Sequence, residues 1–201
     1  MRKTIGLLIL SLPVWLNAQI TVAVKAGVNL SVNPTSSDFT SDLRFGYFIG
    51  GSVSPKIKKV LGYRSEIMLS RQGYDYRSSS SSGHVNLDYL LLPQLLVLKF
   101  TKKVQLQLGG QLAFLLNARV DSSGAGNGSL LDYLDRFDYG VTGGVEVSPL
   151  GGFFIGIRAS EGLKNLVKPV YEGPIPGNYP GFIPKNWLRN RNFQIFTGWR
   201  F

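Results

Sequence analysis

The only histidine of the chain, His84, closes the segment SSSSSGH, which begins at Ser78. A serine hydroxyl beside an imidazole can form the nucleophile–base pair of a hydrolase or an acyl transferase. Such a pair works only when a third group orients the imidazole, and a low-complexity serine run supplies none. We therefore predict that the chain has no catalytic residue, and a lipid-modifying enzyme is the least favoured of the functions considered.

A second set of reactive side chains is charged and lies where polar and apolar residues alternate: Arg64, Glu66, Glu146, Arg158 and Arg200. Opposite charges that share the interior of a narrow barrel pair with one another, so this set indicates a structural ion-pair network rather than a gated ion path. The chain has no cysteine, which excludes thiolate metal ligands, a cysteine nucleophile and a lipid anchor on cysteine. We predict neither a metal site nor a cofactor.

These residues are positioned by strands. Period-two alternation bounded by turn residues predicts eight of them, at about 20–32, 43–54, 60–77, 84–100, 104–119, 136–148, 152–163 and 191–201. Short connections with turn chemistry alternate strictly with longer connections that are rich in Ser, Gly, Asn, Asp and Pro. In an up-and-down meander, this alternation places all short turns at one end and all long loops at the other.

The two faces of each strand indicate which side meets lipid. In the strand at 104–119, one face is apolar from Val104 to Leu116, whereas the other begins at Gln105 and ends at Arg119. The polar faces of the last four strands carry no lysine, unlike the charged outer surface of a soluble barrel. The polar face is therefore interior and the apolar face meets lipid. The predicted fold class is all-β, an eight-stranded antiparallel up-and-down transmembrane β-barrel of OmpA/OmpX-like size.

The N-terminus has the pattern of a secretory signal. Two basic residues precede an apolar run that ends at Leu16, and cleavage is expected after Ala18. The run is too short for a membrane-spanning helix, which needs about 20 residues. We predict a signal peptide at 1–18 and an outer-membrane β-barrel domain at 19–201. Loss of the two basic residues lowers the formal net charge from +10 to +8. Because the protein is exported, we expect no nucleic-acid partner.

The last strand, RNFQIFTGWRF, ends on an aromatic residue, Phe201, with Trp199 two positions before it. Aromatic residues gather where barrel strands meet the membrane interface. In a closed barrel this strand pairs with the first, so no edge is left exposed. Before closure the strand can add to a partner sheet, and we expect the outer-membrane assembly machinery to recognise it in that way.

Several segments together resemble a known family: VKAGVNLS (24–31), YLLLPQLLVLKF (89–100), DYGVTGGVEVS (138–148), FFIGIRASEGLKNL (153–166) and the terminal FQIFTGWRF. They are similar to the small outer-membrane β-barrel proteins of the PorT type, over nearly the whole mature chain. The resemblance implies an eight-stranded barrel, integral to a Gram-negative outer membrane, with no catalytic motif. The name-giving member is linked to the type IX secretion system, so an accessory role in secretion or surface assembly is also implied.

The predicted size limits the function. Side chains fill the interior of an eight-stranded barrel, so we do not expect an open porin. We expect a monomer with a structural or interaction role, in contact with outer-membrane lipid, lipopolysaccharide and a protein partner. The alternative is a surface-binding, adhesin-like barrel that acts through its longest loop, 164–190. That loop carries five prolines among basic and aromatic side chains, a composition that suits anionic sugars or protein surfaces.

Overall fold

The computed structural model describes residues 20–32, 40–42, 44–55, 60–77, 82–122, 128–168 and 189–201. The strands in them are β1 (Ile20–Val32), β2 (Thr40–Asp42), β3 (Arg44–Pro55), β4 (Leu61–Arg77), β5 (Ser82–Lys99), β6 (Val104–Ser122), β7 (Gly128–Ser129), β8 (Phe137–Val147), β9 (Phe153–Gly162) and β10 (Arg191–Arg200). No helix in this described part is long and apolar enough to cross a membrane. The predicted signal peptide at 1–18 lies outside the described residues.

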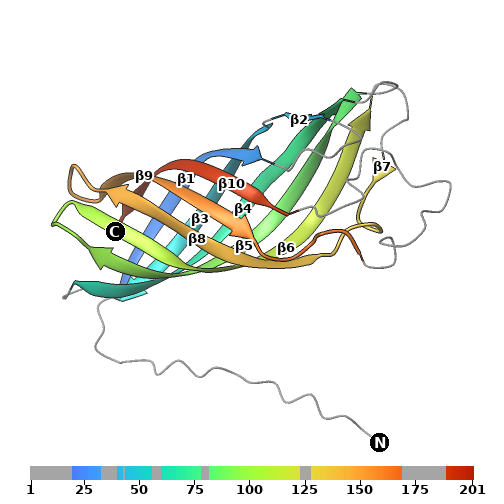
Figure 1. Cartoon of the computed structure of the whole chain (residues 1–201). Helices are drawn as coiled ribbons and strands as arrows, with labels where there is room; N and C mark the ends of the chain where they lie inside the picture. The colour runs from blue at the N-terminus through green and yellow to red at the C-terminus, as the bar shows by residue number, and fades with distance from the viewer. Residues whose placement is uncertain are drawn as a thin grey trace, which may run out of the picture.

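Eight long strands close into one antiparallel barrel, as predicted. Each pairs with its neighbours in chain order, and β1 pairs with β10 to close the ring. In Figure 1 the tight connections gather at the end where the C-terminus lies, which we call the short-turn end. The short strands β2 and β7 lie toward the opposite end, the loop side. The alternation of short and long connections in the sequence predicted this order.

The strands differ in length. β4, β5 and β6 have 17, 18 and 19 residues, whereas β8, β9 and β10 have 11, 10 and 10. A membrane-spanning β-strand needs about 9–11 residues, so β4, β5 and β6 extend past the others on the loop side (Figure 1). We call this extension the loop-side wall, residues 71–77, 82–88 and 117–122, together with β2 and β7. The predicted strands include most of this wall, but β5 begins at Ser82 rather than at 84 and β6 ends at Ser122 rather than at 119, and the two strands pair as far as Gly83 and Ser122.

The inward and outward faces alternate as predicted. Leu108 on β6 is 66% exposed on the outside, whereas its neighbour Gln107 is 3% exposed in the interior. Exposed apolar side chains surround the barrel, for example Val24, Ile49, Ile67, Leu96, Val141, Ile157 and Ile195. An apolar hollow of about 620 Å³ lies on this outer face across β1, β8, β9 and β10. The outer surface is therefore the one that meets lipid.

One face assignment from the sequence is wrong. Strict alternation places Arg119 in the interior, but a β-bulge between β5 and β6 leaves Leu116 without a partner on β5. An extra residue of this kind reverses the alternation beyond it. Ala118 is therefore buried, and Arg119 is exposed on the loop-side wall.

The aromatic residues at the end of the chain face outward, as the sequence predicts. Phe201, at the C-terminus marked in Figure 1, is 75% exposed, and Trp199, two residues before it, is 47% exposed. β10 pairs with β1 as far as Ala23 opposite Arg200, and the Phe201 amide donates to the carbonyl of Val22 at 2.8 Å. The first strand thus holds the end of the chain.

Inward-facing glycines make room for aromatic rings in the narrow lumen. A Cβ on Gly198 would lie 2.4 Å from the Phe154 ring, and a Cβ on Gly156 would lie 2.4 Å from the Phe196 ring. Each ring therefore occupies the space above a glycine of the neighbouring strand. This pairing of rings with glycines fills the interior with side chains, as the size of the barrel requires.

Candidate functional site

The lumen toward the short-turn end holds two buried carboxylates, each bound to more than one cation. Glu66 on β4 accepts hydrogen bonds from Lys25 at 2.5 Å and from Arg158 at 2.6 and 3.1 Å. These three side chains are at most 3% exposed. The Lys25 ammonium also lies 4.9 Å from the centre of the Phe196 ring, a cation–π contact. Buried charges are tolerated when they are paired and hydrogen-bonded in this way.

Glu146 on β8 is the second carboxylate. It accepts hydrogen bonds from Arg64 at 2.7 and 3.3 Å, from Gln107 at 2.8 Å, and from Arg200. The side-chain oxygen of Gln107 accepts a hydrogen bond from Arg158 at 2.5 Å, which joins the two carboxylates into one network. We call these side chains the lumen network. They come from β1, β4, β6, β8, β9 and β10, so the network links opposite walls of the barrel.

The lumen network confirms the pairing predicted from the sequence and adds to it. All five charged residues singled out there belong to it: Arg64, Glu66, Glu146, Arg158 and Arg200. Lys25 and Gln107 were not predicted as members of the network. Lys25 does occupy an inward position of the period-two pattern, between Val24 and Ala26. With its four cations and two carboxylates ionised, the network has a formal charge of +2.

Neutral polar side chains line the lumen between this network and the loop side. The Asn29 amide donates to Ser70 at 2.8 Å, and its oxygen accepts from Gln194 at 3.0 Å and from Asn192 at 3.2 Å. Gln72 donates to the same Ser70 hydroxyl at 3.0 Å. These hydrogen bonds join β1, β4 and β10 across the interior. Side chains therefore fill the middle of the barrel as well as the part toward the short-turn end.

An apolar plug lies on the loop side of the polar lumen. It consists of Leu130, Leu134, Leu166 and Val167, which are buried in one cluster with inward-facing side chains of β4, β5 and β6. The backbone holds it together: Asp135 donates to the carbonyl of Leu166 at 2.7 Å, and Leu134 forms a β-bridge with Val167. The two chain segments that follow β7 and β9 therefore fold back into the barrel mouth. The sequence predicts both segments as parts of long connections, so their place in the interior is a correction from the structure.

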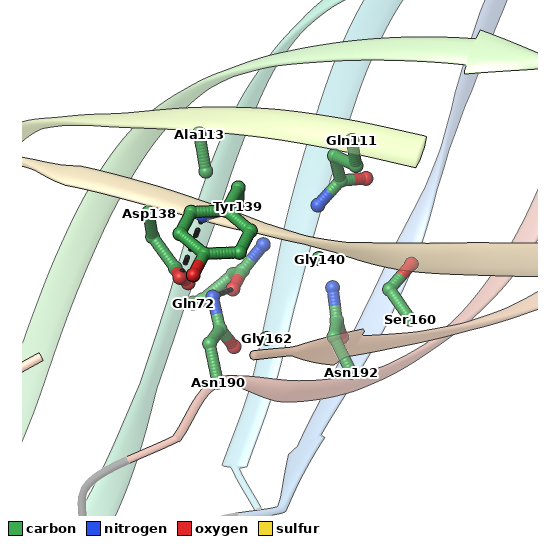
Figure 2. Close-up of a pocket in the computed structure, with 10 residues that line it drawn as sticks. All are labelled: Gln72, Gln111, Ala113, Asp138, Tyr139, Gly140, Ser160, Gly162, Asn190 and Asn192. Atoms are coloured by element: carbon green, nitrogen blue, oxygen red, sulfur yellow. Dashed lines mark hydrogen bonds between the residues drawn. The ribbon is translucent and has the colours of Figure 1, made fainter. Parts of the chain in front are cut away.

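A small polar cavity of about 10 Å³ lies in the same half of the lumen (Figure 2). Its side chains come from five strands and from the residue before β10: Gln72, Gln111, Asp138, Ser160, Asn190 and Asn192. Asn190 donates to Gln72 at 2.6 Å, and the Tyr139 amide donates to the Asp138 carboxylate at 2.7 Å. A cavity of this size has room for one water molecule or one ion.

The surroundings of His84 differ from those predicted. It lies in β5, and its Nε2 atom is 3.0 Å from the Asp121 carboxylate, so a group that orients the imidazole is present. Both side chains are well exposed, and an exposed pair of this kind contributes little to stability. Serines 78–81 lie outside the described residues, as do positions 169–188 of the predicted binding loop.

The comparison with known families decides the class of this protein. Residues 17–168 match the family described as outer membrane protein beta-barrel domain. The chain belongs to this family. It is therefore an integral protein of the outer membrane, as its sequence predicted. A search of curated proteins finds no match.

Solved outer-membrane barrels share the fold. The attachment invasion locus protein Ail of Yersinia pestis, in complex with the heparin analogue sucrose octasulfate, superposes with a TM-score of 0.53 at 13% identity, over 91% of this chain and 99% of that one. Neisserial surface protein A gives 0.52 at 16% identity, over 90% and 95%. OprG of Pseudomonas aeruginosa gives 0.50 at 8% identity, over 92% and 97%. At these identities the likeness establishes the fold.

Proposed function

We propose that this family member is a filled, non-enzymatic barrel, not an open porin, that acts by binding a protein partner at its loop side. The observation that carries the proposal is the contrast between the lumen and the loop-side wall. Among the described residues, the lumen network and the apolar plug fill the interior at two levels, which supports a barrel that does not conduct nutrients. The loop-side wall, in contrast, stands clear of the lipid-facing band and offers a surface for recognition.

The outer face of the loop-side wall has the composition of an interaction surface. Arg71 forms a bidentate pair with Asp88 at 2.7 and 3.1 Å and lies 5.7 Å from the centre of the Tyr47 ring. Arg119 is exposed on β6, the strand that pairs with β5 on the side away from β4. Arginine and tyrosine are enriched in protein interfaces. Because β2 and β7 pair with the outer strands of the wall, we expect a partner to bind its faces rather than add a strand to its edges.

Site-specific photo-crosslinking in cells tests this proposal. A crosslinking amino acid at Arg119 should capture a discrete protein, because the position lies on the proposed surface. The same amino acid at Leu108, on the lipid face of the same strand, is the matched control and should capture no discrete protein. Equal protein adducts at both positions, or none at Arg119, would contradict the proposal.

The finer role we propose is accessory to secretion or surface assembly. The PorT-type motifs of the sequence support it, and a barrel that binds a partner without transporting solutes is suited to such a task. Deleting the gene should reduce release of type IX cargo proteins while the outer membrane stays intact. Normal cargo release in the deletion strain would count against this role.

A surface-binding role is the second candidate. The shared fold with Ail, which was solved with a heparin analogue, favours it, as do the basic and aromatic residues of the loop at 164–190. Deleting 172–183 should abolish binding to anionic sugars or host surfaces while secretion stays normal if this role is correct. Loss of secretion with unchanged surface binding would favour the first role instead.

A further inference from the structure

Gln94 on β5 places a polar amide in the middle of the lipid-facing band. Its neighbours in the chain, Pro93 and Leu95, are buried, so Gln94 faces outward. The other outward positions between 90 and 98 are all leucine: Leu90, Leu92, Leu96 and Leu98. A β-strand crosses the hydrocarbon region in about 9–11 residues, so Gln94 lies at the centre of such a span. An amide in hydrocarbon is costly unless its donors and acceptors are satisfied.

Two outward residues of β4 satisfy part of this amide. Its nitrogen donates to the Ser65 hydroxyl at 3.0 Å, and its oxygen accepts a hydrogen bond from the Tyr63 hydroxyl. A glutamine amide has two N–H donors and two acceptor positions. The hydrogen bonds formed within the described barrel therefore leave one N–H and one acceptor position of Gln94 for a partner. Thr197, exposed on β10, differs, because its hydroxyl donates to the Phe154 carbonyl of its own barrel at 3.1 Å.

A glycine beside Gln94 leaves the lipid face open to a close approach. Gly110 on β6 lies directly opposite Gln94 in the sheet and is exposed. Among the described residues, a Cβ at Gly110 would meet only the Gly140 carbonyl oxygen, 3.9 Å away, so the packing of the barrel does not require glycine here. The inward Gly109 contrasts with it, since its Cβ would lie 1.9 Å from the Gln94 carbonyl oxygen. A glycine that its own sheet does not need suits a position where another chain approaches the backbone.

We propose that Gln94, Ser65 and Gly110 form the contact of a homodimer within the membrane. Apolar contact alone favours association little there, because lipid chains are as apolar as leucine, whereas hydrogen bonds and close backbone packing do favour it. The remaining N–H and acceptor position of Gln94 can pair with the same groups of a second copy. A two-fold axis along the membrane normal at Gln94 makes this contact isologous. It also keeps both loop sides on the same side of the membrane.

The chemistry of this face selects a second copy as the partner. Tyr63, Ser65 and Gln94 carry no charge, so the partner must offer one neutral donor and one neutral acceptor at the same depth in the membrane. Another copy of the chain supplies both by symmetry. The proposal replaces the monomer expected from the sequence. It is independent of the loop-side partner, because the contact lies in the lipid-facing band and not on the loop-side wall.

Sedimentation equilibrium of the full mature chain, refolded in density-matched detergent micelles, tests the proposal. Gln94→Leu removes the amide and keeps a side chain of similar size, whereas Gly110→Leu keeps the amide and fills the space beside it. The matched controls lie on strands across the ring from β5. Thr197→Val removes a lipid-facing hydroxyl, and Ala159→Leu adds bulk at an exposed position of β9. The heat-modifiable gel mobility of a folded barrel verifies that each variant is folded.

Crosslinking in the native membrane gives an independent readout. The chain has no cysteine, so a single introduced cysteine is the only site at which a membrane-permeant bismaleimide joins two copies. Leu96→Cys, next to Gln94 on the outer face of β5, should give a product of twice the monomer mass. Ile157→Cys, exposed on β9, is the control and should not give this product.

We expect a dimer for the wild type and for both control variants. Gln94→Leu and Gly110→Leu should weaken dimerisation by at least about tenfold, and adding Gln94→Leu to Leu96→Cys should remove the crosslinked product. A wild type that is monomeric in micelles and not crosslinked in cells would overturn the proposal and leave the bonds of Gln94 to Tyr63 and Ser65 as an internal feature of the barrel. A dimer unchanged in Gln94→Leu and Gly110→Leu would also overturn it, since the interface would lie elsewhere. Loss of the dimer in the control variants as well would overturn it by showing non-specific association.

Discussion

Replacing Glu66 by glutamine should destabilise the barrel more than a single polar substitution normally does. The change removes the charge that binds both Lys25 and Arg158 but keeps the size of the side chain. All three side chains are at most 3% exposed, so solvent cannot take over the lost pairing. The formal charge of the lumen network would rise from +2 to +3. Removing one partner of a buried pair typically costs about 3–5 kcal/mol, and we expect Glu66→Gln to lie in this range.

The assay is reversible urea unfolding in detergent, followed by tryptophan fluorescence and by the gel mobility of the folded barrel. The matched control is Glu161→Gln, which breaks the exposed pair with Arg191 and should cost at most about 1 kcal/mol. The double variant Lys25→Met/Glu66→Gln restores the network charge to +2 and should recover part of the loss. Equal losses in Glu66→Gln and Glu161→Gln would refute the network as a stabilising element, as would a double variant less stable than Glu66→Gln alone.

Three further changes probe the outer face, the chain end and the histidine. Leu108→Arg, on the lipid face, should cost about 2–4 kcal/mol in the same unfolding assay, and no cost would mean that the two faces are misassigned. Deleting Phe201 should lower outer-membrane levels in cells much more than it lowers the in vitro unfolding midpoint. Normal outer-membrane levels would mean that Phe201 is not needed for assembly and serves only as an anchor at the membrane interface. His84→Ala should leave lipid A composition, measured by mass spectrometry, unchanged, and a lost modification would revive the enzyme hypothesis.

The strands and their faces could be predicted because side-chain direction in a strand is a local property. Leu108 and Gln107 point to opposite sides because they are successive residues of one strand. Their residue types, apolar and polar, alternate in the sequence to match the two faces. Arg119 shows the limit of that reasoning. The bulge at Leu116 depends on how β5 pairs with β6, and no residue type in the sequence marks it.

The lumen was predictable in kind but not in detail. Charged residues at inward positions of a narrow barrel must find partners, so a network including Glu66 and Arg158 could be expected. Lys25 lies 41 residues from Glu66 in the chain, and only the closed barrel brings the two together. The apolar plug was harder still to predict, because Leu134 and Val167 lie in polar segments that carry no periodic pattern. The cavity beside Asp138 likewise requires five strands to be in register.

The central claim is that side chains fill the lumen of this outer-membrane barrel, so that it acts through its surface. Recording the current across a planar bilayer that contains the refolded mature chain tests this claim most directly. We predict an electrically silent membrane, because the lumen network and the apolar plug fill the interior of the described barrel at two levels. Regular unitary current steps that grow with salt concentration would contradict the claim and would identify the protein as a channel.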